Sequence, residues 1–338
     1  MTANKNLIAF DRVSLGFFPT PLEALDRVGA QLGIRLLIKR DDLNGFGGGG
    51  NKVRKLEFIL PEALASGADT LITTGGLQSN HARIVAAAAR KLGLHPLLAL
   101  EGKAPAGAQG NLLLDRLFDA EIVFVDSTED AGGPVALLEA QAERVKSRGG
   151  KPYIIPLGGA GARGALGYIH AVRETQAQLE SAGLPPPDFL VVSAGTGSTL
   201  AALHVGARWL WPSTQVIGIT VSRKDETAYR AGVARQATEA AELAGLGGTW
   251  TADDIVIDTG YFAPGYGEPS DGGVAAIRLL AREEGVLLDP VYTAKGFDGL
   301  IGLVRRQRIP QGSSVLFVHT GGLPALYHFA DRLAATGA

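Results

Sequence analysis

Short runs of β-branched and aliphatic residues alternate with longer amphipathic segments along most of this chain. The short runs are predicted to be strands at residues 35–40, 70–75, 95–101, 120–126, 152–157, 189–195, 215–221 and 314–322. The segments between them, such as ARIVAAAARKLG, repeat apolar residues at spacings of three and four, which is typical of amphipathic helices. Strands that are apolar throughout and separated by helices indicate parallel sheets covered on both faces. We therefore predict an α/β fold.

Length and composition agree with this fold and exclude several classes of function. A chain of 338 residues, 46% apolar and 20% charged, suggests two globular domains and not a disordered protein. Its net charge of −2 gives no electrostatic basis for binding nucleic acid or an anionic membrane. The absence of cysteine excludes disulfides, cysteine-ligated metals and a thiol nucleophile, and no metal site is expected. No signal peptide or membrane span is predicted, so we expect a cytoplasmic protein.

Glycine is unusually frequent, with 46 residues, and its clusters mark the candidate ligand site. The run Gly47–Gly50 precedes Asn51 and Lys52 at the start of a predicted helix. Glycine lets the backbone adopt positive φ and approach a ligand closely. We expect the dipole of the helix to lower the pKa of Lys52, and a lysine with a lowered pKa suits Schiff-base chemistry. The alternative is a flexible loop with a lysine that faces solvent.

A second cluster, TTGGLQSNHAR at residues 73–83, runs from the end of a predicted strand into a helix. The carboxyl end of a parallel strand followed by a helix N-terminus is where α/β proteins bind ligands. Ser79 or Asn80 can serve simply as the helix N-cap. One N-cap explains one polar residue and leaves the others, among them His81, as candidate ligand contacts.

The third cluster, VVSAGTGST at residues 191–199, joins a buried strand to a helix through small residues. Backbone amides at a helix N-terminus, together with hydroxyl groups, form a cradle for one small phosphate. The alternative is a tight turn between strand and helix. The predicted cradle consists of Gly195, Thr196, Gly197, Ser198 and Thr199.

The C-terminal part of the chain supplies aromatic and hydroxyl groups. Tyr261, Tyr266 and Tyr292 occupy loops beside glycine and proline, where aromatic residues often serve ligands. Thr320 follows a predicted strand and is suited to hydrogen-bond a heteroaromatic nitrogen. A lysine, a cradle for one phosphate and a partner for a ring nitrogen together indicate pyridoxal 5'-phosphate as the cofactor.

The motifs GGNKVRKLEF, QSNHAR, SAGTGST, YFAPGYG, DPVYT and HTGG follow one another in this order. With this set the chain resembles the D-cysteine desulfhydrase and 1-aminocyclopropane-1-carboxylate deaminase family, from residue 18 to about residue 327. The resemblance implies two open, twisted, mainly parallel-sheet α/β domains of the tryptophan-synthase-β-like, type II pyridoxal-phosphate architecture, with the cofactor between them. We expect a smaller domain of residues 53–162, a larger domain of residues 1–52 plus 163–338, and a homodimer.

The resemblance also implies roles for single residues. Lys52 is expected to form the Schiff base with the cofactor and to remove the Cα proton, whereas Lys55 is not. Asn80 would hydrogen-bond the phenolic oxygen of the cofactor, and Ser79 would contact the substrate carboxylate or assist proton transfer. Thr320 would face the pyridine nitrogen. The expected substrate contacts are Ser79, Asn80, His81, Tyr261, Tyr292 and Thr293, and Tyr292 is expected to be catalytic with Lys52 and Ser79.

Two positions favour the desulfhydrase branch. Ring-opening deaminases of the family carry Glu after the pocket tyrosine and Leu in place of the threonine of HTGG, whereas this chain has Thr293 and Thr320. His81 agrees with the same branch. The implied reaction is an α,β-elimination on a small amino acid, D-cysteine, that yields pyruvate, sulfide and ammonia.

Several alternatives stay open at this point. The substrate could instead be L-cysteate, 1-aminocyclopropane-1-carboxylate or a β-chloro- or β-hydroxy-D-amino acid, and a non-catalytic amino-acid or cofactor sensor is the alternative of a different class. A dinucleotide-dependent dehydrogenase is disfavoured because no acidic residue closes the predicted strand that follows the glycine run, as a GxGxxG site requires. Arg163 departs from the family pattern and is either a surface residue or a partner for a second acidic group. The run Gly47–Gly50 is longer than in relatives and is expected to be more mobile.

Overall fold

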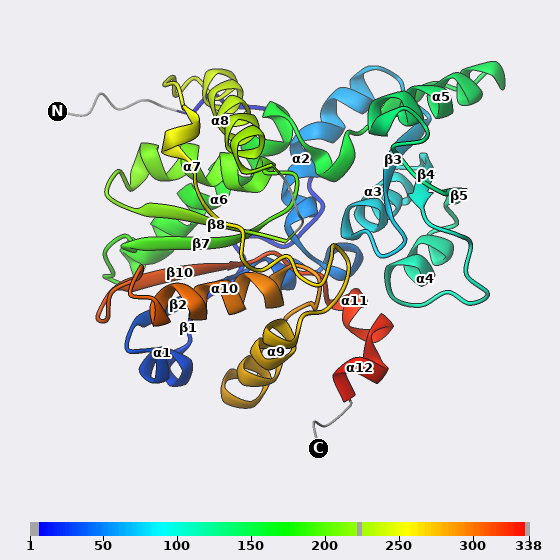
Figure 1. Cartoon of the computed structure of the whole chain (residues 1–338). Coiled ribbons are helices and arrows are strands. Elements are labelled where there is room, and N and C mark those ends of the chain that lie inside the picture. Colours follow the sequence, from blue (N-terminus) through cyan, green and yellow to red (C-terminus); the bar gives the residue numbers. More distant parts are fainter. Residues whose placement is uncertain (1–6, 222–224, 335–338) are drawn as a thin grey trace.

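The computed structural model of the protein describes residues 7–221 and 225–334, which form two β-sheets flanked by helices (Figure 1). The larger sheet consists of β1 (Leu22–Ala24), β2 (Arg35–Arg40), β7 (Phe189–Ala194), β8 (Gln215–Thr220), β9 (Val256–Asp258) and β10 (Ser314–His319). Its strand order is β1-β2-β10-β7-β8-β9. All neighbours are parallel except β1 and β2, which are antiparallel.

The smaller sheet is parallel throughout. It consists of β3 (Thr70–Gly76), β4 (His95–Glu101), β5 (Glu121–Val125) and β6 (Pro152–Ile154), in the order β5-β4-β3-β6. These strands come from one continuous stretch of the chain, whereas the strands of the larger sheet come from both sides of that stretch. The boundaries at residues 52 and 162 between two domains stay a prediction.

Helices cover both faces of the larger sheet. They are α1 (Asp26–Leu32), α6 (Ala162–Ser181), α7 (Ser198–Leu210), α8 (Glu226–Leu243), α9 (Asp271–Glu284) and α10 (Thr293–Arg305). Figure 1 shows α6, α7 and α8 on one side of the sheet and α1, α9 and α10 on the other. Successive strand residues point to opposite faces, so Val191 of β7 packs in the core with α9 and α10, while Leu190 and Val192 pack with α6 and α7.

The smaller sheet is covered in the same way. Its helices are α2 (Asn51–Ala65), α3 (Asn80–Lys91), α4 (Gly110–Leu117) and α5 (Gly133–Ser147). Leu71 of β3 packs with residues of α2 and α3, and its neighbour Ile72 packs with residues of α5 on the opposite face. The last two helices of the described residues are α11 (Leu323–His328) and α12 (Ala330–Ala334). Within residues 7–221 and 225–334, no helix combines the length and the apolar character needed to cross a membrane.

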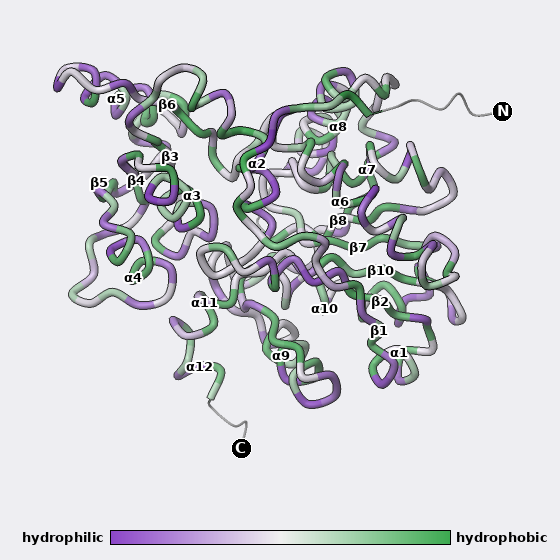
Figure 2. The backbone as a smooth tube through the Cα atoms, turned by 180° about the vertical axis from the view of Figure 1, so that it is seen from behind, coloured by the Kyte–Doolittle hydropathy of each residue, from purple (hydrophilic) through white to green (hydrophobic). Residues whose placement is uncertain are grey.

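This arrangement confirms the predicted α/β fold with two mainly parallel sheets. Figure 2 shows hydrophobic residues concentrated in the central strands β7, β8 and β10. The three-residue strands β1 and β9 were not predicted, because they are too short to form an apolar run. The strand expected at residues 152–157 ends at Ile154, shortly before Pro156, and the short 3-10 helix η3 (Leu157–Gly159) follows.

Candidate functional site

The candidate site lies where the carboxyl ends of several strands meet the start of α2. The backbone N–H of Asn51 donates to the carbonyl oxygen of Thr320, just after β10, at 2.9 Å. The side-chain Nδ2 of Asn51 donates to Oγ1 of Thr199, in the first turn of α7, at 3.2 Å. The first turn of α2, which carries Lys52, is therefore tied directly to the predicted phosphate cradle and to the HTGG segment.

Lys52 and Lys55 have different surroundings although both lie on α2. Burial lowers the pKa of Lys52 to about 8, so burial has the effect that the sequence analysis assigned to the helix dipole. In the described part of the chain no acceptor lies within hydrogen-bond distance of Lys52 Nζ, whereas Lys55 Nζ donates to the carbonyl oxygen of Gly158 at 3.2 Å. Burial, together with the charge of Lys52, also lowers the pKa of Lys55. Lys52 is thus the lysine whose amine is left for a ligand.

The glycine run before Lys52 is held by several bonds, in contrast to the mobility expected from sequence. The carbonyl of Gly50 accepts from Nδ2 of Asn44 at 2.9 Å, and its N–H donates to the carbonyl of Asp41 at 3.0 Å. The carbonyl of Gly49 accepts from Nη2 of Arg83 at 3.0 Å. Gly49 and Gly50 have φ values of 72° and 119°, a region that side-chain-bearing residues rarely adopt, so glycine is required here.

The QSNH segment divides its polar groups between the helix and the site. Ser79 is the N-cap of α3, and its hydroxyl accepts from the backbone N–H of Ala82 at 3.1 Å. Oδ1 of Asn80 accepts from Nδ2 of Asn111 at 2.9 Å. Nδ2 of Asn80 lies close to Gly322, the last residue of the HTGG segment, because a Cβ atom added to Gly322 would be 3.0 Å from it. The side chain of Asn80 is thus brought beside the HTGG segment, which also carries Thr320.

His81 lies deeper than a substrate contact would require. It is 3% exposed, and its Nε2 forms a hydrogen bond of 2.8 Å with Oγ1 of Thr73. Burial, followed by the charges of Lys52 and Lys55, lowers the pKa of His81 well below its usual range, so its ring is neutral at pH 7. The predicted contact of His81 with substrate stays a prediction.

The segment from Gly195 to Thr199 has the features of an anion cradle. Gly197 adopts a φ of 91° and forms the N-cap of α7, which begins at Ser198. The hydroxyl of Ser198 is buried without a hydrogen-bond partner among the described residues. A buried hydroxyl at a helix N-terminus, where backbone N–H groups point along the helix axis, fits a phosphate group. These residues would hold the phosphate of pyridoxal 5'-phosphate, with Lys52 as the amine for its aldehyde.

The structure pairs Tyr292 with Tyr266, not with Tyr261. The hydroxyl groups of Tyr266 and Tyr292 form a hydrogen bond, and their rings cross at 75° with centroids 6.1 Å apart. The hydroxyl of Tyr261 instead accepts from Nη1 of Arg306 at 3.0 Å. The Tyr261 hydroxyl lies beside Gly302 of α10, ten residues after Tyr292, so about 15 Å of helix separates Tyr292 from the residue that Tyr261 contacts. The predicted contact of Tyr261 with substrate stays a prediction. Tyr266, which the sequence analysis named as a loop tyrosine without assigning it a substrate contact, is the tyrosine that the structure places beside Tyr292.

Thr293 does not direct its hydroxyl into the site. It is fully buried, and its Oγ1 donates to Oδ1 of Asp289 at 2.7 Å. Oδ2 of Asp289 accepts from the backbone N–H of Tyr292 at 3.0 Å, so the carboxylate organises the start of α10. Thr293 therefore supports the backbone that carries Tyr292, and Asp289, which sequence reasoning passed over, performs the capping.

Arg163 lies on the surface. Its Nε forms an ion pair with Glu62 Oε2 at 2.6 Å, and its side chain is 42% exposed. Of the two interpretations of this residue from sequence, the surface one agrees with this contact.

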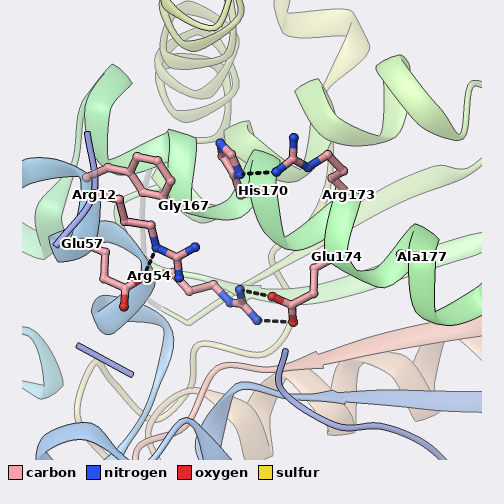
Figure 3. A pocket seen from close by; sticks show the side chains of 9 residues that line it. Arg12, Arg54, Glu57, Gly167, His170, Arg173, Glu174 and Ala177 are labelled. Atoms are coloured by element: carbon pink, nitrogen blue, oxygen red, sulfur yellow. Dashed lines mark hydrogen bonds and ion pairs between the residues drawn. The ribbon is translucent and has the colours of Figure 1, made fainter. Parts of the chain in front are cut away.

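The cavity in Figure 3 is separate from the candidate site. It has a volume of about 230 Å³ and lies between α2, α6 and the N-terminal segment, where Arg12, Arg54, Glu57 and Glu174 line it. Arg54 and Glu57 follow Lys52 by two and five positions, which places them on the other side of α2. Within the described ranges, no group of three or more histidine or acidic side chains is arranged to hold a metal ion.

Comparison with known proteins gives one consistent answer. A family model described as pyridoxal-phosphate dependent enzyme matches residues 13–321. D-cysteine desulfhydrases from two strains of Klebsiella pneumoniae are 43% identical over 334 residues, covering 97% of this chain and 99% of theirs. A solved structure described as an ACC deaminase homologue has a TM-score of 0.87 and 39% identity and covers 96% of both chains. Threonine deaminase isoform 2 from Solanum lycopersicum, at 17% identity and a TM-score of 0.64 over 96% of this chain and 85% of that one, shares the fold.

Proposed function

This chain belongs to the pyridoxal-phosphate dependent enzyme family, and on that premise we propose that it is a lyase that converts D-cysteine to pyruvate, sulfide and ammonia. The observation that carries the proposal is the similarity, over almost the whole of both chains, to the D-cysteine desulfhydrases of Klebsiella. The lowered pKa of Lys52 and the unpartnered hydroxyl of Ser198 support it independently of that similarity.

The bound cofactor would supply an electron sink for the negative charge that forms at Cα of the substrate. Lys52, with a pKa of about 8, is deprotonated in part at neutral pH and is suited to take the Cα proton. Ser79 would orient the substrate carboxylate, and the amides from Gly195 to Thr199 would bind the phosphate.

Tyr266 and Tyr292 are suited to donate a proton to the leaving sulfur. Loss of solvent around the hydroxyl groups raises the pKa of both tyrosines, in Tyr292 well above its usual range, although Tyr266 as a whole is 55% exposed. Both hydroxyls therefore keep their protons at neutral pH. In a hydrogen-bonded pair of hydroxyls one proton is shared and the other is left for a third group. The pair can therefore act as an acid toward the substrate and is poorly suited to act as a base.

The competing substrates differ in the group that must be accommodated. An L-cysteate lyase needs a cation for the sulfonate, and Arg163, the candidate from sequence, is paired with Glu62 at the surface. A non-catalytic sensor has no need for a lysine amine with a lowered pKa at the start of α2.

We further propose that the protein is a cytoplasmic homodimer. The family resemblance supports the homodimer, and the absence of cysteine supports the cytoplasmic location.

The test is an absorbance spectrum of the purified protein with pyridoxal phosphate, followed by pyruvate assays on D-cysteine, L-cysteine, L-cysteate and 1-aminocyclopropane-1-carboxylate. We expect a cofactor band and pyruvate from D-cysteine. A band with pyruvate from L-cysteate alone would keep the lyase and change the substrate. Absence of a band after addition of the cofactor would contradict the proposal and favour the sensor.

A further inference from the structure

Arg83 is a fully buried arginine of α3 whose hydrogen bonds all go to neutral acceptors. Its Nε donates to Oδ1 of Asn111 at 2.6 Å and its Nη2 to the carbonyl of Gly49 at 3.0 Å, while Nη1 donates to the carbonyl of Gly47. Burial lowers its pKa only to about 10, so the guanidinium stays charged at neutral pH. A buried charge of this kind has a structural consequence for each group that it contacts.

The first consequence concerns the side-chain amide of Asn111. A guanidinium has only donors, so the atom of Asn111 that faces Arg83 must be Oδ1. Nδ2 then points the other way and donates to the backbone carbonyl of Gln78 and to Oδ1 of Asn80, both at 2.9 Å. All hydrogen-bonding groups of this amide are used, so it has one favourable orientation.

The second consequence concerns Asn80, which is predicted to contact the cofactor. Because Nδ2 of Asn111 can only donate, Asn80 must present its oxygen to Asn111. Its own Nδ2 then turns toward Gly322 and the HTGG segment, where it has no acceptor in the described part of the chain. The donor of this amide is left for a ligand.

We propose that Arg83, acting through Asn111, is a positioning residue that holds the amide of Asn80 with its Nδ2, and not its oxygen, toward the cofactor. The inference rests on the proposed function, because it assumes that pyridoxal phosphate binds beside Asn80. A donor at this place stabilises the anionic form of the phenolic oxygen, whereas a reversed amide would set one partial negative charge against another.

The decisive variant is Asn111→Asp, which keeps an acceptor for Arg83 and replaces Nδ2 by a second acceptor. Asn80 can then satisfy this acceptor only by turning its Nδ2 toward it, so its oxygen faces the cofactor. We expect the affinity of the cofactor-free protein for pyridoxal phosphate to fall by about 10- to 100-fold, the range for a hydrogen bond to a charged group. We also expect an upward shift of the pH at which the absorbance of the bound cofactor changes, which a merely structural role would not produce.

A double-mutant cycle with Asn80→Ala separates rotation of the amide from the charge of the new carboxylate. If the effect passes through Asn80, Asn111→Asp adds no further change in affinity or absorbance in the Asn80→Ala background. A matched control is Asp115→Asn, one turn further along α4, because Asp115 is buried near Arg83 and has no hydrogen-bond partner among the described residues. We expect wild-type affinity and wild-type absorbance for this control.

Two results would overturn this inference without contradicting the proposed function. One is an effect of Asn111→Asp that persists undiminished without the Asn80 amide, and the other is wild-type binding by Asn111→Asp when Asn80→Ala binds weakly. A wild-type protein that binds no pyridoxal phosphate would overturn the proposed function and the inference together. If Asn111→Asp fails to fold, Asn111→Ser can replace it, because this variant removes the amide without adding charge. We expect Asn111→Ser to cause a smaller loss of affinity for pyridoxal phosphate, and this loss must also vanish in the Asn80→Ala background.

Discussion

At the scale of single residues, the two lysines of α2 differ in what their amines contact. Lys55 donates to Gly158, and Lys52 has no acceptor among the described residues. We predict that Lys52→Ala abolishes the near-visible absorbance of covalently held pyridoxal phosphate and lowers pyruvate formation by roughly 10³-fold or more. Lys55→Ala is the matched control and should keep the absorbance. The reverse pattern would assign the reactive amine to Lys55.

Asp115 is a second residue whose environment sets a measurable property. Burial raises its pKa to about 8, and neither carboxyl oxygen has a hydrogen-bond partner among the described residues. In the unfolded chain the same group ionises near pH 4, so between about pH 4 and pH 8 its titration favours the unfolded chain increasingly as the pH rises. At pH 7 the titration of Asp115 is expected to lower the free energy of unfolding by roughly 4 kcal/mol.

We therefore predict that Asp115→Asn, which removes the ionisation and keeps the size, stabilises the protein in a pH-dependent manner. Its advantage over the wild-type protein should be small at pH 4.5, on the order of 1 kcal/mol, and should grow toward pH 8. Urea unfolding of both proteins at several pH values measures this difference. An advantage that does not change with pH would mean that Asp115 is already ionised in the folded protein.

At the scale of elements, the glycine run determines how α2 begins. A Cβ atom at Gly49 would lie 2.2 Å from the carbonyl oxygen of Asp42, and the φ of Gly49 is 72°. We predict that Gly49→Ala destabilises the protein by roughly 2–4 kcal/mol and weakens cofactor binding, because the backbone before Lys52 must move. Gly67→Ala is the control, since Gly67 has a φ of 70° and open space around it. Gly67→Ala should lower the free energy of unfolding by about 1 kcal/mol and leave cofactor binding unchanged, as measured by thermal unfolding and cofactor titration.

The same elements show what sequence reasoning can reach. The strands, the helix starts next to Lys52 and Ser79 and the cradle before α7 follow from apolar runs and turn chemistry, which act over a few residues. The pairing of Tyr292 with Tyr266 depends on the course of a loop between two elements, and two tyrosines of one motif look alike in sequence. Likewise, the bonds from Arg83 to Asn111 and Gly49 join segments about 30 residues apart, and no local pattern announces them.

At the scale of the whole molecule, buried ion pairs connect α2 to the larger sheet and to α6. Arg54 of α2 bonds Oδ1 of Asp41, just after β2, at 2.8 Å and Oε2 of Glu174 of α6 at 2.9 Å. Lys39 of β2 donates to the same Glu174 at 2.6 Å. These cations hold the pKa of Asp41 and of Glu174 below the usual carboxyl range, so both groups are charged at neutral pH. The contribution of these carboxylates to stability is present above about pH 4 and is lost as the pH falls below it.

We predict that Arg54→Leu lowers the free energy of unfolding by about 3–5 kcal/mol at pH 7, because it leaves two carboxylates buried without their main partner. The control is Arg163→Leu, which breaks a half-exposed pair with Glu62 between the same two helices and should cost less than about 1 kcal/mol. Urea unfolding at pH 7 and near pH 3 measures both variants. The loss in Arg54→Leu should shrink at the lower pH, where the carboxylates take up protons in the variant. Equal losses in the two variants at pH 7 would mean that burial adds nothing to this connection, and the attachment of α2 to α6 would then rest on apolar packing alone.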